Sequence, residues 1–171
     1  MTSQRYPMSK LVLFALAAAL LGPQLALAQD DPVPQAKDHA GHFRVFTGAG
    51  EPATLDDIVE AMADVEAVLV GEIHTDPVGH WVEAELFRRA VELTGAGEEA
   101  GARRALALSL EMFERDVQYI LDEYLDDVIT ESQFKASARP WEHYDEDYRA
   151  MVETAKAAGV PVLAANAPDA M

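Results

Sequence analysis

The chain has 171 residues, enough for one domain, and half of them are hydrophobic, so it is expected to fold around a core. Its 30 Asp and Glu against 13 Lys and Arg give a formal net charge of −17. This balance makes nucleic acids and anionic lipids poor partners, because binding to phosphate groups relies on Lys and Arg. The chain contains no cysteine, which excludes disulfides, thiolate metal sites, Cys nucleophiles and a lipidated Cys.

The first 28 residues have the features of a secretory signal peptide. Arg5 and Lys10 precede an apolar run at 11–21, and a triplet of small and apolar residues that ends at Ala28 follows a Gly-Pro break. The apolar run is shorter than the roughly 20 residues that a membrane-spanning helix needs. The pattern predicts cleavage after Ala28, a periplasmic or secreted location, and a mature chain without a transmembrane segment.

Residues 29–42 are rich in Pro, Asp and small residues and predict a flexible leader ahead of a domain at 43–171. The domain is expected to open with a short strand at 43–46. A helix should follow, because Thr54 can cap its first turn and Asp57 completes a capping box.

Further along the chain, apolar runs alternate with amphipathic segments. Continuous apolar runs are typical of strands covered on both faces, and they lie at 67–70, 105–110 and 160–165. The amphipathic segments predict helices at 77–93, 114–128 and 144–158, with Asp76 capping the first and Gly159 ending the last. This alternation predicts an α/β fold, a parallel sheet with flanking helices.

Polar side chains follow each expected strand. Glu72 and His74 come after the first, Glu111 after the second and Asn166 after the third. Ligands of open parallel sheets bind beyond the carboxyl ends of the strands, so these side chains are expected to share one rim. Glu72 and His74 leave an extended segment on the same face, where they can hold a metal or act together in acid–base chemistry. His80, one turn into the next helix, can reach the same rim.

Four ordered elements together resemble the ChaN-like haem-binding uptake family of the Tiki and erythromycin-esterase-like superfamily. They are VLVGEIH at 68–74, LEMF at 110–113, Trp141 with Tyr148, and VLAANAP at 162–168. The resemblance covers about residues 43–169. It implies an exported haem-binding protein of haem and iron uptake, in which a Tyr holds the haem iron and a His assists, in some cases across a homodimer.

The resemblance also implies site residues by position. Tyr148 is the first candidate for the haem ligand and Tyr144 the second, and the other cofactor-binding candidates are His80, His74 and Asn166. The cationic groups expected to offset the haem propionates are Lys135, Arg139, His143 and Arg149. The family domain is longer than this chain, which stops soon after the third strand, so an incomplete, N-terminal half of the domain is expected.

Enzymatic relatives imply an alternative, a metal-dependent hydrolase of peptides or esters. Glu72 would act as the base, with His74 and Glu111 as metal ligands or acid–base partners, and zinc or manganese as the divalent metal. A catalytic zinc usually takes three protein ligands and keeps one position open, which half a domain can barely supply. We therefore favour a haem carrier over an enzyme.

Overall fold

The computed structural model describes residues 39–96 and 105–168, so the expected signal peptide and most of the expected leader lie outside the described residues. Its elements, in chain order, are β1 (Val45–Phe46), β2 (Pro52–Ala53), α1 (Leu55–Met62), α2 (Pro77–Thr94), β3 (Leu108–Glu114), a 3-10 turn η1 (Arg115–Val117), α3 (Gln118–Leu125), α4 (Glu131–Ala138), a π-helical turn η2 (Tyr144–Tyr148), α5 (Arg149–Ala158) and β4 (Val162–Asn166). Among these elements, no helix is both long and apolar enough to cross a bilayer.

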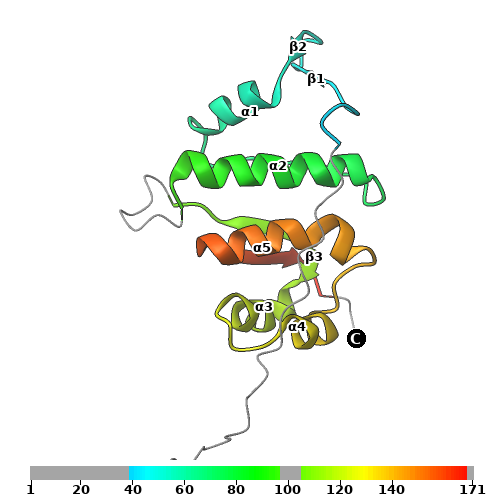
Figure 1. Ribbon diagram of the computed structural model, residues 1–171, viewed down its shortest axis with the longest axis vertical. Coiled ribbons are helices and arrows are strands. Elements are labelled where there is room, and N and C mark those ends of the chain that lie inside the picture. Colours follow the sequence, from blue (N-terminus) through cyan, green and yellow to red (C-terminus); the bar gives the residue numbers. More distant parts are fainter. Residues whose placement is uncertain (1–38, 97–104, 169–171) are drawn as a thin grey trace, which may run out of the picture. The chain divides into compact units, whose positions relative to one another are not determined.

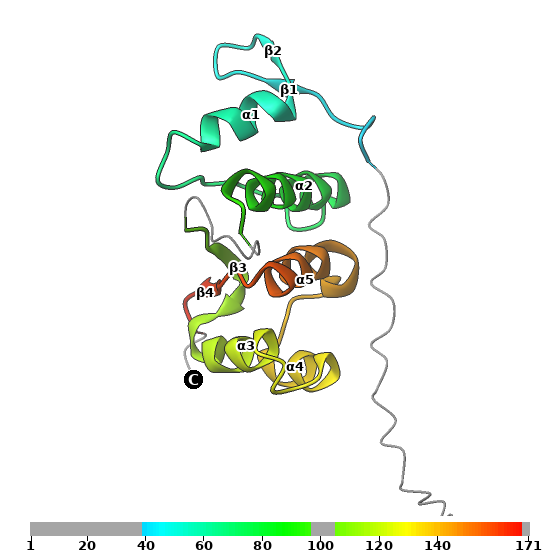
Figure 2. The same ribbon diagram turned by 60° about the vertical axis from the view of Figure 1, so that its left-hand side comes forward.

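The central feature of the domain is a parallel pair of strands, β3 and β4, which confirms an α/β fold with helices around a small parallel sheet. Leu108 lies opposite Val162, and an irregularity follows Leu110 before Glu114 meets Asn166. Figures 1 and 2 show α1, α2 and α5 following one another toward the strands, with α3 and α4 beyond them. An antiparallel pair, β1 and β2, precedes α1.

The helix ends follow the capping signals of the sequence. Thr54 and Asp57 form the expected capping box of α1, and the Asp76 carboxylate accepts a hydrogen bond from the Val78 amide at 3.0 Å. Gly159 ends α5 in the left-handed conformation, with φ of 61°, which costs glycine little. The Asp76 cap therefore fixes the residue at which α2 begins.

The strand predicted at 67–70 is absent, which corrects the sequence analysis. Residues 63–76 form no helix or strand, and Leu69 is 96 % exposed. An apolar run becomes a buried strand only where another strand and a helix cover it. Within the described residues β3 pairs with β4 alone and the run at 67–70 pairs with neither strand, so it stays exposed.

Other predicted boundaries shift for local reasons. The second strand begins at Leu108 and continues to Glu114, and the helix predicted at 114–128 is divided into η1 and α3. The helix predicted at 144–158 begins with the π-helical turn η2. The sequence analysis missed α4, although Thr130 and Gln133 form its capping box.

An aromatic cluster forms the centre of the core. The ring of Phe134 stacks on Tyr124 with 4.5 Å between centroids and lies 5.6 Å from Phe113. Phe113, Phe134 and Leu121 are fully buried. Burying aromatic rings of this size contributes strongly to stability, so α4 is fixed to β3 and α3 mainly through Phe134.

The Gln118 side chain covers part of the edge of β4. Its Nε2 donates to the Val162 carbonyl at 2.8 Å, and its Oε1 accepts from the Ala164 amide at 2.8 Å. These are the hydrogen bonds that a neighbouring strand would otherwise make. The side chain at the start of α3 therefore replaces part of a strand partner for β4.

Candidate binding site

Six polar side chains meet between α2, η2 and the loop ahead of α2, and we call them the Glu72 cluster. Its members are Glu72, His74, His80, Glu83, Asp147 and Tyr148. Glu72 and His74 come from the loop, His80 and Glu83 from α2, and Asp147 and Tyr148 from η2. His80 and Glu83 are three residues apart and therefore lie on one face of α2.

Glu72 is the centre of the cluster. Its Oε1 accepts the Tyr148 phenol at 2.7 Å and lies 2.6 Å from His74 Nδ1. Its Oε2 lies 3.3 Å from His80 Nε2. One carboxylate therefore joins the loop, α2 and η2.

His80 is the most deeply buried member of the cluster, with 1 % of its surface exposed. Its Nδ1 lies 3.3 Å from Asp147 Oδ2, so both ring nitrogens face carboxylates. Neither nitrogen makes a hydrogen bond with any group in the described part of the chain. The His80 ring also packs on the Tyr148 ring, with centroids 4.6 Å apart.

Burial and hydrogen bonding shift three pKa values in the cluster. Burial alone would raise the pKa of Glu72, but hydrogen bonds from Tyr148 and His74 help to lower it below its usual value. Burial and the neighbouring Glu72 carboxylate raise the pKa of Glu83 to about 8. Burial and the hydrogen bond to Glu72 also raise the pKa of the Tyr148 phenol. At neutral pH the cluster thus holds an ionised Glu72 and a protonated Tyr148.

His74 is the exposed member of the cluster. Its side chain is 55 % exposed, against 15 % for the Glu72 side chain that it contacts. Its ring lies edge-on to Trp141 with centroids 4.5 Å apart, and Trp141 in turn lies 6.2 Å from the Tyr148 ring. These contacts fix the imidazole at the surface of the cluster.

Of the predicted site residues, the structure brings Glu72, His74, His80 and Tyr148 together. The others lie elsewhere in the fold. Tyr144 belongs to the aromatic core, where its ring lies 5.9 Å from Phe134. Glu111 lies in the middle of β3 and is exposed, because the strand runs on to Glu114. Asn166 ends β4 opposite Glu114. The carboxylate at the carboxyl end of β3 is therefore that of Glu114 and not that of Glu111.

Two cluster members, Glu83 and Asp147, were missed in the sequence. Glu83 had a usable signal, since His80 and Glu83 form an H-x-x-E pair on a predicted helix. Asp147 had none, because its position depends on η2, a π-helical turn that periodicity does not predict.

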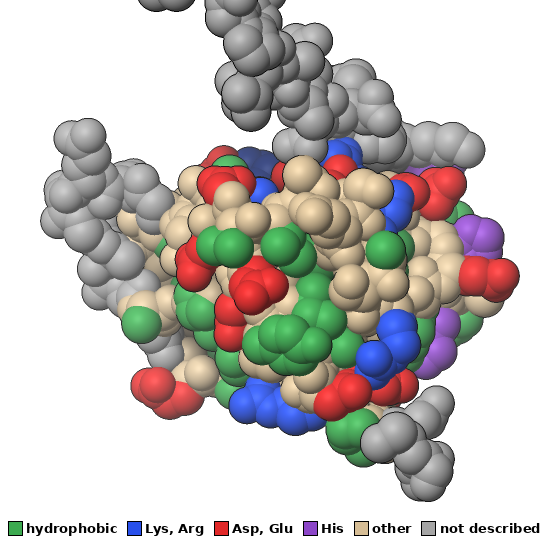
Figure 3. Space-filling view, turned by 90° about the horizontal axis from the view of Figure 1, so that it is seen from below, with side chains coloured by type: hydrophobic (Ala, Val, Ile, Leu, Met, Phe, Trp, Pro, Cys, Tyr) green, Lys and Arg blue, Asp and Glu red, His purple; other side chains and the backbone are tan. Residues whose placement is uncertain are grey.

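Three of the four groups expected to offset the propionates are already paired with acidic side chains. Lys135 contacts Asp145 at 2.6 Å. Arg139 binds Glu114 and Asp116, and Arg149 binds Glu131, and Figure 3 shows basic side chains beside acidic ones on the face that it presents. Each of these cations would have to leave an acidic partner to bind an anion.

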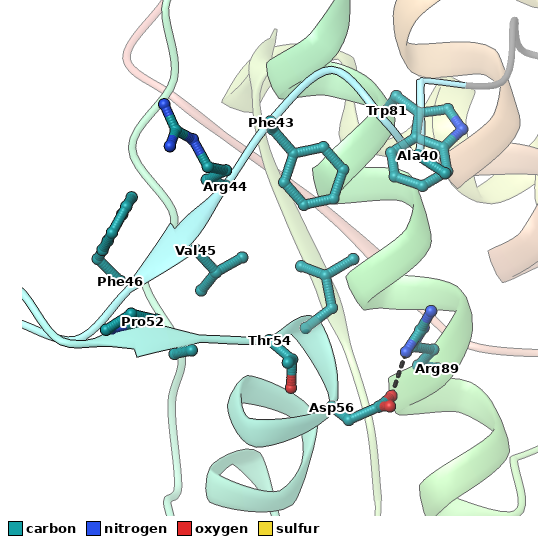
Figure 4. Close-up of a pocket in the computed structure, with 12 residues that line it drawn as sticks. Ala40, Phe43, Arg44, Val45, Phe46, Pro52, Thr54, Asp56, Trp81 and Arg89 are labelled. Atoms are coloured by element: carbon teal, nitrogen blue, oxygen red, sulfur yellow. Dashed lines mark hydrogen bonds and ion pairs between the residues drawn. The ribbon is translucent and has the colours of Figure 1, made fainter.

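A separate cavity of about 510 Å³ lies among β1, β2, α1 and α2. Its lining is largely apolar and aromatic, and in Figure 4 Phe43 and Trp81 face one another at its edge, with ring centroids 5.7 Å apart. Arg89 is held there by Asp56. No member of the Glu72 cluster lines this cavity.

A family model described as haem-binding uptake, Tiki superfamily, ChaN matches residues 58–171, a range that includes the whole Glu72 cluster. No curated protein and no solved structure matches the chain. The chain therefore belongs to the ChaN family of haem-binding uptake proteins in the Tiki superfamily, as its motifs predicted.

Proposed function

We propose that this chain is an exported haem-binding protein that takes part in haem or iron uptake, with haem as its cargo. Family membership supports the ligand class. The observation that carries the proposal is the environment of His74, an exposed imidazole whose Nδ1 lies 2.6 Å from an ionised carboxylate.

The hydrogen bond to Glu72 decides which nitrogen of His74 can bind iron. A carboxylate can only accept a hydrogen bond, so Nδ1 is the donor, and Nε2, which takes no part in this contact, is the nitrogen left to bind iron. A neutral imidazole nitrogen is a common axial ligand of haem iron. A carboxylate on the other ring nitrogen orients the ring and makes it more basic. His74 is therefore prepared to bind ferric haem without rearrangement of Glu72.

Exposed apolar side chains beside His74 in the sequence fit the porphyrin. Leu69, Val70 and Ile73 are all exposed, although large apolar side chains in succession usually lie in a core. Exposed apolar patches of this kind mark interaction sites. The donor set and the apolar segment together fit haem, whose iron would take the His74 nitrogen and whose ring would cover apolar surface.

Tyr148 and Tyr144 are less accessible than His74, since each is 3 % exposed. Iron could reach the Tyr148 oxygen only if the phenol left Glu72 and the cluster opened. We assign Tyr148 the role of holding Glu72 in place, and through it His74. Tyr144 packs in the core, and His80 is too deeply buried to meet a porphyrin.

The geometry supports haem binding better than hydrolysis by the predicted set Glu72, His74 and Glu111. Glu72 already accepts two hydrogen bonds at Oε1, and Glu111 projects from the middle of β3 as an exposed side chain. A hydrolase would need all three at one reacting centre.

Titration of the purified full chain with ferric haem tests the proposal. We expect a saturable change in the Soret band and at least a tenfold loss of haem affinity in His74→Gln. Tyr148→Phe should weaken binding less. His42→Gln is the matched control, because His42 is an exposed histidine outside the Glu72 cluster. Loss of binding in Tyr148→Phe alone would assign the iron to tyrosine, and no saturable change in the wild type would overturn the proposal.

The proposal of export rests on the sequence of residues 1–28 alone. Intact-mass analysis of the protein recovered from outside the cytoplasm should give a chain that begins at Gln29. Recovery of a chain that retains residues 1–28 would contradict cleavage.

A further inference from the structure

Three potential ligand side chains of the Glu72 cluster lie close enough to share one ion. One donor atom each from Glu72, His80 and Glu83 lies within 4.8 Å of the other two. The two oxygens of Glu72 face different partners: Oε1 accepts from Tyr148 and lies against His74, whereas Oε2 faces His80. Oε2 is thus the oxygen that is placed to bind an ion shared with His80 and Glu83.

His80 independently indicates a missing partner. The residue is 1 % exposed, and neither of its ring nitrogens makes a hydrogen bond with a group in residues 39–96 or 105–168. Buried polar atoms are nearly always hydrogen-bonded, and exceptions call for an explanation such as an ion. Its Nε2 points toward Glu72 Oε2 at 3.3 Å, into the space that the three donors border.

The carboxylates of Glu72 and Glu83 also indicate a missing cation. Glu83 is half-buried, and one of its carboxylate oxygens lies within 4.8 Å of an oxygen of Glu72. Two carboxylates in a partly buried site repel one another unless a proton or a cation lies between them. A cation at this place would satisfy Glu72, Glu83 and His80 together.

We infer that Glu72, His80 and Glu83 form a binding site for a divalent first-row transition-metal ion, separate from the haem ligand His74. One imidazole nitrogen and two carboxylate oxygens suit Zn²⁺, Mn²⁺, Fe²⁺ or Co²⁺, whereas Ca²⁺ and Mg²⁺ prefer oxygen ligands alone. Three protein ligands leave room for water as a further ligand.

Asp147 is the positioning residue of this site. Its Oδ2 lies 3.3 Å from Nδ1 of His80, the ring nitrogen that faces away from the three donors. When Nε2 binds a metal, Nδ1 carries the proton, and a carboxylate beside Nδ1 holds the ring in place. The sequence of contacts from Asp147 through His80 to the ion would repeat the carboxylate–histidine–metal arrangement of known metal sites.

Titration of the haem-free full chain with Co²⁺, followed by visible absorption, tests the site. We expect saturable d–d bands, and at least a tenfold loss of Co²⁺ affinity in His80→Gln and in Glu83→Gln. Asp147→Asn should cost about tenfold, because it removes orientation and not a ligand. Thermal unfolding followed by circular dichroism, with and without Co²⁺, reports both folding and binding, since an ion that binds the native state raises its stability.

The pair His39 and His42 supplies the matched control. The two rings lie 5.5 Å apart, and two histidines three residues apart can bind Co²⁺ by themselves. The double variant His39→Gln/His42→Gln should keep the Co²⁺ signal. A signal that disappears in this double variant but persists in His80→Gln would overturn the inference.

The two proposals fail separately. A wild-type chain that binds haem but gives no saturable Co²⁺ signal would overturn the metal site alone. A chain that binds Co²⁺ through His80 and Glu83 but gives no Soret change would overturn haem binding and leave the metal site standing.

Discussion

Tyr144 and Tyr148 begin and end the same π-helical turn, η2, and are equally buried, yet they serve different surroundings. The Tyr144 ring packs on Phe134 and Phe113, and its phenol oxygen makes no hydrogen bond with a described group. The Tyr148 phenol donates to Glu72 at 2.7 Å. The turn η2 therefore joins the aromatic core to the Glu72 cluster, and packing of Tyr144 in the core helps to fix the position of Tyr148 in the cluster.

The largest effect should come from removing the aromatic anchor on the core side. Phe134→Ala leaves a cavity beside the Tyr124 and Tyr144 rings, and we expect a loss of about 3–5 kcal/mol in the free energy of unfolding. Urea denaturation measures it. Phe46→Ala, at an exposed position on β1, should cost less than about 0.5 kcal/mol. Equal losses in the two variants would contradict the proposed role of the core.

The two tyrosines themselves should respond differently to loss of the phenol oxygen. Tyr148→Phe removes a hydrogen bond to a charged, partly buried acceptor and should cost about 2 kcal/mol. Tyr144→Phe removes an unsatisfied buried hydroxyl and should be neutral or slightly stabilising. The same denaturation assay compares them. A larger loss in Tyr144→Phe than in Tyr148→Phe would reverse the assignment of the two sides of η2.

Stability should depend on pH through Glu83. Its pKa is raised from 4.5 to about 8, so between these values the native state binds more protons than the unfolded state. This contribution is fully present below pH 4.5 and is lost as pH rises toward 8. Glu83→Gln should therefore flatten the fall in unfolding free energy between pH 5 and pH 8, whereas Glu60→Gln, at an exposed position on α1, should not. Identical pH profiles for wild type and Glu83→Gln would refute the shift.

The smallest effect should come from a surface ion pair. Lys135 contacts Asp145 at 2.6 Å with both side chains well exposed. Such pairs contribute about 0–1 kcal/mol and are screened by salt. Lys135→Met should thus change the unfolding free energy by less than about 1 kcal/mol in low salt, and the difference should shrink at 1 M salt. A larger, salt-independent loss would show that Lys135 stabilises the core through Tyr144, whose ring it faces at 5.9 Å.

Local signals in the sequence predicted the helices well because caps are local chemistry. Asp76, Pro77 and Gly159 specify the ends of α2 and α5 without help from distant residues. The same kind of signal, Thr130 with Gln133, was present for α4 and was missed. A strand is different, because the run at 67–70 has the composition of a buried strand but needs a partner that sequence periodicity does not identify.

The candidate site was predictable where its members are close in sequence. Glu72 and His74 share a face of an extended segment, and they meet in the structure. Glu111 was misplaced at a strand end because the expected strand stopped four residues too early, at 110 and not at Glu114. Asp147 reaches His80 only through the π-helical geometry of η2, so neither helical nor strand periodicity could have paired them.

The identity of the iron ligand is the central claim, and a vibrational spectrum tests it most directly. Resonance Raman spectroscopy of the ferric haem complex distinguishes a bound phenolate, which adds its own ring vibrations, from a bound imidazole. With His74 as the ligand, phenolate bands should be absent in the wild type, and His74→Gln should change the iron coordination. Phenolate bands in the wild type that disappear in Tyr148→Phe would contradict the claim and show that the cluster opens to release Tyr148.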